Sequence, residues 1–172
     1  MSRDIDFVTQ LGRPFVAHRL RRVAELFLDG YSRWLPELGV TAPARTLSTL
    51  LLLENGPLGV TEIAGRLRLS HPLMIKLVAS LEEAGLVRVD RDAEDRRRRP
   101  ASLTHDGFAE LDRVKSALRI LDQAYAELFV EIGVDLTAAA ARVEDACLRD
   151  PFEERLRRAA ETLTREKEHA CD

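Results

Sequence analysis

Residues 61–105 read TEIAGRLRLS HPLMIKLVAS LEEAGLVRVD RDAEDRRRRP ASLTH, and the class of fold follows from this stretch. Thr61 and Ser70 each precede an apolar-periodic segment, where a hydroxyl oxygen accepts a hydrogen bond from an unpaired N–H of a first helical turn. Ala84 and Gly85 are typical of a helix end. The pattern therefore predicts two short helices with a brief turn between them. The second is expected to bury Leu73, Met74, Leu77, Val78 and Leu81.

Residues 86–89 and 101–103 are the only alternating stretches in the chain. The charged tract from Asp90 to Arg99 joins them, so they predict a two-stranded hairpin with a polar tip. Pro100 lacks the N–H that a strand ladder uses. The returning strand is therefore expected to be short or to lie at an edge.

Helical spacings of three and four residues dominate the rest of the chain. One helix is expected from Arg13 or Pro14 to Trp34, and a buried leucine-rich helix is expected after Pro43. Thr104 is expected to cap a helix that runs to about Ile132. At 1.5 Å per residue its length is about 42 Å, which matches or exceeds the diameter of the domain. Such a helix needs something beyond its own domain to pack against. Two further helices are expected at residues 136–148 and from residue 152.

The composition fits one globular unit. The chain has 172 residues, of which 45% are hydrophobic, enough to form a core without disulfides or a structural metal. Cys147 and Cys171 have neither a disulfide-framework nor a zinc-site spacing, which favours a reducing cytoplasm. No apolar run is long enough to span a membrane, so no membrane partner is expected.

The charge is unevenly distributed along the chain. Residues 61–105 hold nine Lys and Arg against seven Asp and Glu, a net charge of +2, so the rest of the chain, whose total is −3, carries −5. Two helices, a short turn and a hairpin with arginines at its tip suit duplex DNA, because one helix fits the major groove while cations meet phosphates and the minor groove. A basic face on an acidic protein steers that face toward phosphate.

This stretch also resembles the MarR family of bacterial winged helix-turn-helix regulators. The resemblance rests on the segments LGVTEIA at 58–64, LSHP at 69–72, LEEAGLV at 81–87, DRR at 95–97 and SLTHDG at 102–107, and it covers about residues 45–130. It implies a mostly α fold with a small two- to three-stranded β wing and long terminal dimerisation helices. The implied division is a dimerisation region at 1–42, a DNA-binding lobe at 43–104 and dimerisation helices at 105–172.

The resemblance implies which residues meet DNA. The helix from Ser70 to Ala84 is expected to enter the major groove, and Arg97, oriented by Asp95, to reach the minor groove. The full set of DNA-binding candidates is Thr61, Arg66, Arg68, Ser70, His71, Pro72, Ile75, Lys76, Ser80, Arg91, Asp95, Arg96, Arg97 and Arg98. An effector pocket is implied between the dimer helices and the DNA-binding lobe, with His18, Arg19, Trp34 and Arg45 as candidates.

Two features depart from the family pattern. Val89 stands where many relatives carry an arginine at the base of the wing. On the outward face of the second helix, only His71, Lys76 and Ser80 are evident hydrogen-bonding candidates for base edges. Specificity would then depend largely on groove shape and on the wing arginines.

The sequence and the resemblance together predict a homodimeric, operator-binding transcriptional regulator. Two other functions are the alternatives. The apolar start of the second helix, residues 72–75, would also suit a protein partner, which makes a protein-interaction module the alternative. An enzyme is least supported, because the sequence has no nucleophile elbow, phosphate loop or metalloprotease motif.

No cofactor or metal is expected. His169 and Cys171 suit a frayed terminus better than a metal site, and Cys147 suits a small core residue better than a redox sensor.

Overall fold

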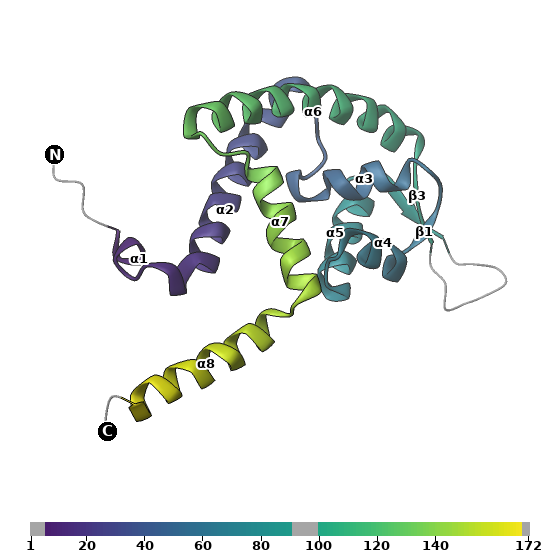
Figure 1. Ribbon diagram of the computed structural model, residues 1–172. Helices are drawn as coiled ribbons and strands as arrows, with labels where there is room; N and C mark the ends of the chain where they lie inside the picture. Colours follow the sequence, from purple (N-terminus) through teal and green to yellow (C-terminus); the bar gives the residue numbers. More distant parts are fainter. Residues whose placement is uncertain (1–5, 91–99, 170–172) are drawn as a thin grey trace. The chain divides into compact units, whose positions relative to one another are not determined.

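The computed structural model describes residues 6–90 and 100–169 (Figure 1). The chain forms two compact units, residues 1–119 and 120–172. The boundary falls within one long helix, α6 (His105–Ile132), whose first half belongs to unit 1 and whose second half belongs to unit 2. Within the described ranges, no helix is both long and apolar enough to cross a membrane.

Unit 1 begins with the expected N-terminal helix and one short helix that the sequence did not suggest. The short helix α1 (Phe7–Gln10) is capped by Asp6, whose carboxylate accepts from Val8 N at 3.3 Å and also pairs with Arg22 of the next helix. The 3-10 helix η1 (Arg13–Phe15) contains Pro14 and leads into α2 (Val16–Trp34). The expected helix is thus confirmed, with a tighter first turn.

The core of unit 1 surrounds a helix-turn-helix and a small sheet. In chain order its elements are η2 (Leu35–Leu38), η3 (Ala44–Thr46), α3 (Leu47–Leu53), β1 (Leu58–Gly59), α4 (Val60–Leu67), α5 (His71–Glu83), β2 (Val87–Val89) and β3 (Pro100–Leu103). Leu50, Ile63, Met74 and Leu81 have no exposed surface and unite α3, α4 and α5 in one core. This confirms the mostly helical fold with a small β wing.

The sheet has three antiparallel strands in the order β1-β3-β2. Val87 lies opposite Leu103, and Gly59 lies opposite Pro100. β3 is short, which confirms the expectation of a short or edge strand, and it is the central strand of the sheet. Pro100 is tolerated because it is the first residue of β3 and still accepts a hydrogen bond from Asp90 N at 3.1 Å.

The structure also corrects two details of the helix-turn-helix. Thr61 does not cap α4, because β1 holds the chain extended to Gly59 and the helix begins directly after it, at Val60. Ser70 does occupy the N-cap position of α5, but its side chain makes no capping hydrogen bond. Leu73 is 40% exposed and therefore lies outside the buried face formed by Met74, Leu77, Val78 and Leu81.

Unit 2 contains the rest of α6, then α7 (Leu136–Arg149) and α8 (Phe152–His169). Gly133 ends α6 with a positive φ of 68°, and Asp135 caps α7 by accepting from Ala138 N at 2.9 Å. Between α7 and α8, the Asp150 carboxylate pairs with Arg158 at 2.5 Å and with Arg155 at 3.3 Å. The expected breaks are confirmed.

Candidate nucleic-acid interface

The turn between α4 and α5 is built from a left-handed residue. Arg68 has φ 52° and ψ 39°, and among the described residues it is the one non-glycine with a positive φ. Leu69 N then donates to Ala64 O at 3.0 Å, which closes the end of α4. α5 begins two residues later, packed against Ile63 and Ala64 of α4 through its own buried face.

Burial of that face leaves the opposite face of α5 open. His71, Pro72, Ile75 and Lys76 are exposed, while Ser80 is half-buried. The Ile75 side chain is 50% exposed, as an apolar group that touches a thymine methyl would need to be. Within residues 6–90 and 100–169, Lys76 forms no ion pair, so its ammonium is available to an external anion.

The first turns of α4 and α5 meet at this face. Thr61 Oγ1 lies 3.5 Å from His71 Nδ1, which brings together two of the residues expected at DNA. Arg66 lies one turn along α4 and pairs with Glu62 at 2.6 Å. Both partners of that pair are about half exposed, so the ion pair is weak and can be exchanged for a phosphate.

Arg88 on β2 adds a cation that is not among the expected DNA-binding residues. Its Nε donates to Asp90 Oδ2 at 3.0 Å and to Ser102 Oγ at 3.2 Å, so the guanidinium is held along the exposed side of the β2-β3 pair. The expected wing contacts at Arg91, Asp95, Arg96, Arg97 and Arg98 lie outside the described residues.

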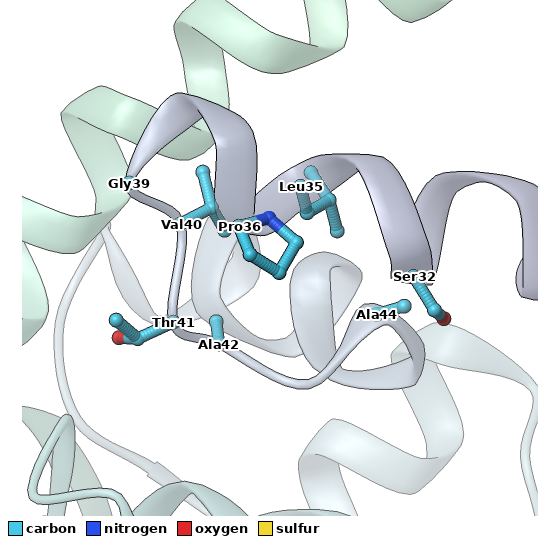
Figure 2. A pocket seen from close by; sticks show the side chains of 8 residues that line it. All are labelled: Ser32, Leu35, Pro36, Gly39, Val40, Thr41, Ala42 and Ala44. Atoms are coloured by element: carbon cyan, nitrogen blue, oxygen red, sulfur yellow. The ribbon is translucent and has the colours of Figure 1, made fainter.

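A cavity of about 280 Å³ lies between the end of α2 with its following turn and the segment that leads to α3 (Figure 2). It is lined by Ser32, Leu35, Pro36, Gly39, Val40, Thr41, Ala42 and Ala44. None of the four expected effector residues lines it. His18 is half-buried and Arg19 exposed on α2, Trp34 packs against the core, and Arg45 pairs with Glu25 at 2.5 Å.

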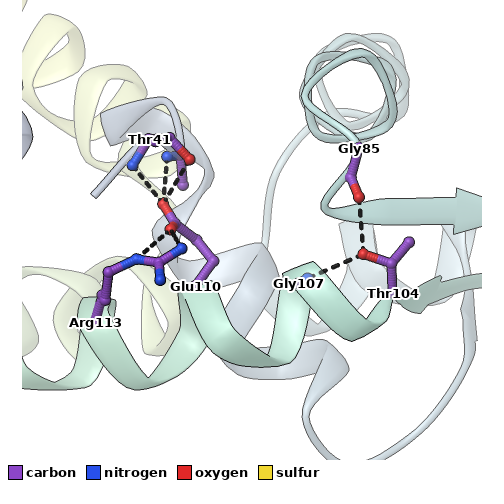
Figure 3. Close-up of polar contacts among 7 residues, drawn as sticks. Thr41, Gly85, Thr104, Gly107, Glu110 and Arg113 are labelled. Atoms are coloured by element: carbon purple, nitrogen blue, oxygen red, sulfur yellow. Dashed lines mark hydrogen bonds and ion pairs between the residues drawn. The ribbon is translucent and has the colours of Figure 1, made fainter. Parts of the chain in front are cut away.

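A buried carboxylate, not singled out from the sequence, holds one wall of that cavity. Glu110 of α6 has no exposed surface, and one of its oxygens accepts from Thr41 N at 2.5 Å, Thr41 Oγ1 at 3.1 Å and Ala42 N at 2.6 Å. Its other oxygen accepts from Arg113 Nε at 2.9 Å and Nη2 at 2.6 Å (Figure 3). The available signal was its place in an otherwise apolar stripe with Gly107, Leu111 and Val114.

These contacts keep Glu110 charged. Burial raises the pKa of the Glu110 carboxyl, but hydrogen bonds from Ala42 N, the Arg113 guanidinium and Thr41 lower that pKa by more, so it lies below its ordinary value.

A second polar contact fixes α6 at the end of α5. Thr104 Oγ1 donates to Gly85 O at 2.7 Å and accepts from Gly107 N at 2.9 Å (Figure 3). Thr104 N also donates to Leu86 O at 3.0 Å. Gly107 lies against Leu86 so closely that a Cβ would collide with the Leu86 carbonyl oxygen.

Comparisons with known proteins extend this description. Residues 38–98 match the MarR family. A probable transcriptional regulator from Pseudomonas aeruginosa is 24% identical, with a TM-score of 0.61, over 74% of this chain and 96% of its own. The transcriptional repressor CouR bound to a 23-mer DNA duplex is 26% identical, with a TM-score of 0.60, over 75% of this chain and 92% of its own. The M. tuberculosis transcriptional regulator MOSR in complex with DNA is 25% identical, with a TM-score of 0.60, over 77% of this chain and 97% of its own.

CouR from Rhodococcus jostii RHA1 has also been solved bound to p-coumaroyl-CoA. A comparison with curated protein sequences gave no match.

Proposed function

We propose that this chain is a DNA-binding transcriptional regulator of the MarR family, and that it acts as a homodimer on a pseudo-palindromic operator. The observation that carries the proposal is the face of α5 that its packing leaves exposed, with Lys76 and Ile75 at its centre. In this proposal α5 lies in the major groove, and the wing arginines implied by the family resemblance, Arg97 foremost, enter the minor groove. A cytoplasmic location accords with that role.

Two copies are proposed because both ends of the chain carry exposed apolar side chains at helical spacing. Those of α2 are Val16, Leu20, Val23 and Leu26, and those of α8 are Phe152, Leu156 and Leu163. Exposed apolar surface of this extent favours a protein interface over solvent. A second copy would cover it and would place two recognition helices on two half-sites.

A small-molecule effector is the third part of the proposal. The cavity beside Thr41 and Ala42 supports it, because it adjoins both the end of α2 and the start of the DNA-binding lobe. CouR bound to p-coumaroyl-CoA shows that a protein of this fold holds a small molecule, and the same role here is an extension to this chain.

The proposed function is tested by selecting genomic fragments with the purified protein and titrating the selected duplex. Lys76→Ala is expected to weaken binding at least about tenfold, since a contact to a charged group contributes about 1.5–3 kcal/mol. Lys167→Ala removes the same charge from α8 and is expected to leave the affinity nearly unchanged. Equal effects of the two substitutions would contradict the placement of α5 at the DNA.

The alternative is a winged-helix module that binds a protein. The exposure of Leu73 and Ile75 at the start of α5 favours it, because these apolar groups suit a protein surface as well as a thymine methyl. Absence of binding to every duplex at low salt, together with capture of a protein that Ile75→Asp abolishes, would favour this alternative.

A further inference from the structure

Two polar contacts fix α6 to parts of unit 1 that are far apart in sequence. We define the Glu110 anchor as Glu110 and Arg113 with Thr41 and Ala42. We define the Thr104 anchor as Thr104 and Gly107 with Gly85 and Leu86. Figure 3 shows both on the same side of the first turns of α6.

The Glu110 anchor is costly to form and hard to replace. Within residues 6–90 and 100–169, Glu110 is the one charged residue with no exposed surface, and its carboxylate accepts five hydrogen bonds. A buried charge is stable only when its partners are complete. The loss of any partner therefore penalises the whole arrangement, which makes the anchor nearly all-or-none.

Each anchor holds a segment that belongs to one of two sites, the cavity wall or the end of α5. Thr41 and Ala42, held by Glu110, form part of the cavity wall. Gly85 and Leu86, held by Thr104, are the residues that end α5, where Leu86 N donates to Leu81 O at 3.0 Å. Glu110 lies six residue steps, about 9 Å of rise, after Thr104 along α6, so one end cannot shift without the other.

We propose that Glu110 is a positioning residue that couples the cavity wall to the recognition helix α5 through the first two turns of α6. Displacement of Thr41 and Ala42, by a cavity occupant or by substitution, releases Glu110, loosens the start of α6 and shifts the end of α5. The inference deepens the proposed function and, for its consequence at DNA, rests on it.

Coupling between two sites is reciprocal, which gives a test that needs no effector. Amide hydrogen exchange resolved to single residues is measured in the full chain for Glu110→Gln and Thr104→Val. Glu110→Gln keeps an acceptor oxygen but turns an amide NH2 toward Arg113. We expect it to speed exchange about tenfold or more at Thr41 and Ala42, and about fivefold or more at Thr104 and Gly107. Thr104→Val is also expected to speed exchange at both anchors, but with the larger effect at Gly107.

The control is Leu52→Ala, which removes apolar packing from α3 without touching either anchor. It is expected to speed exchange throughout unit 1. The two anchor variants are expected to speed exchange at the anchor amides by more than their general loss of stability accounts for. Should Glu110→Gln fail to fold, Thr104→Val alone still tests whether Thr41 and Ala42 respond.

The outcomes separate this inference from the proposed function. If each variant speeds exchange only at its own anchor, the coupling is overturned, whatever the protein binds. If the coupling is present, Glu110→Gln is expected to lower the affinity for the selected duplex at least about fivefold. An unchanged affinity in a protein that does bind DNA overturns the link to α5. Absence of DNA binding in the unsubstituted protein refutes the proposed function, and with it the consequence at DNA.

Discussion

Gly107 shows how closely a single residue fixes the geometry of α6. A Cβ at this position would collide with the backbone carbonyl of Leu86, a group that cannot rotate away. We expect Gly107→Ala to lower the free energy of unfolding by about 1–3 kcal/mol, although alanine favours helices. Urea unfolding at one fixed protein concentration measures this change.

Gly65→Ala is the matched control, because a Cβ on that residue of α4 meets no atom within 4 Å. It is expected to raise stability by about 0.5–1 kcal/mol. A Gly107→Ala protein as stable as the Gly65→Ala protein would show that α6 does not lie against the Leu86 carbonyl as described.

The ionised state of Glu110 predicts a pH dependence of stability. Since the folded-state pKa lies below the ordinary value of 4.5, Glu110 stabilises the fold fully above that pH, and the contribution is lost as pH falls through the folded-state pKa. We expect Glu110→Gln to lower the free energy of unfolding near neutral pH by about 1.5–3 kcal/mol. That difference should shrink as the pH is lowered below about 4.5.

The measurement is urea unfolding of both proteins from neutral to acidic pH, with Glu131→Gln as the control at an exposed position of the same helix. A difference that stays constant or grows at acidic pH would contradict a charged, fully paired Glu110.

At this scale the sequence was informative where the signal is local. The glycine at 85 and the hydroxyl at 104 mark helix ends by their own chemistry, and both were confirmed. Glu110 could not be assigned a partner, because Thr41 and Ala42 lie 69 and 68 residues away, and only the packed fold brings them together.

At the scale of elements, the helices and the hairpin were predictable because period and turn chemistry agree along the chain. The error at Thr61 arose where one element fixes the start of another. Gly59, and not Thr61, ends the extended segment before α4, because β1 pairs with β3. Pro100 occupies the central strand for the same reason, since β1 is too short to have been recognised from sequence.

The wing as an element provides the prediction that depends most on the family resemblance. That resemblance assigns Arg97, oriented by Asp95, to the minor groove, whereas it assigns no DNA contact to Arg99. We expect Arg97→Ala to weaken operator binding by about 1.5–3 kcal/mol and Arg99→Ala by roughly half as much. Asp95→Ala should also weaken binding, although it removes a negative charge.

One operator duplex titrated with the three variants measures these effects. Tighter binding by Asp95→Ala, or equal losses for the two arginine variants, would mean that the wing acts only as diffuse positive charge.

At the scale of the whole molecule, the apolar stripe of α8 predicts self-association. Leu156 is 57% exposed and Leu163 is 59% exposed on one side of the helix, as expected for groups that a second copy covers. We expect Leu156→Glu to shift the protein toward monomer in analytical ultracentrifugation. Thr162→Glu adds the same charge away from the stripe and should remain dimeric. Dimers of equal stability in both variants would exclude α8 from the interface.

The proposed function requires that the exposed face of α5 and the wing bind the phosphates and grooves of duplex DNA. The measurement that tests it most directly is the affinity for a selected operator duplex as a function of salt. If the dimer contacts about six to ten phosphates, the affinity should fall by about 10³ to 10⁵ between roughly 50 and 200 mM salt. No binding to any duplex at low salt, or an affinity that does not change with salt, would show that this surface does not bind DNA.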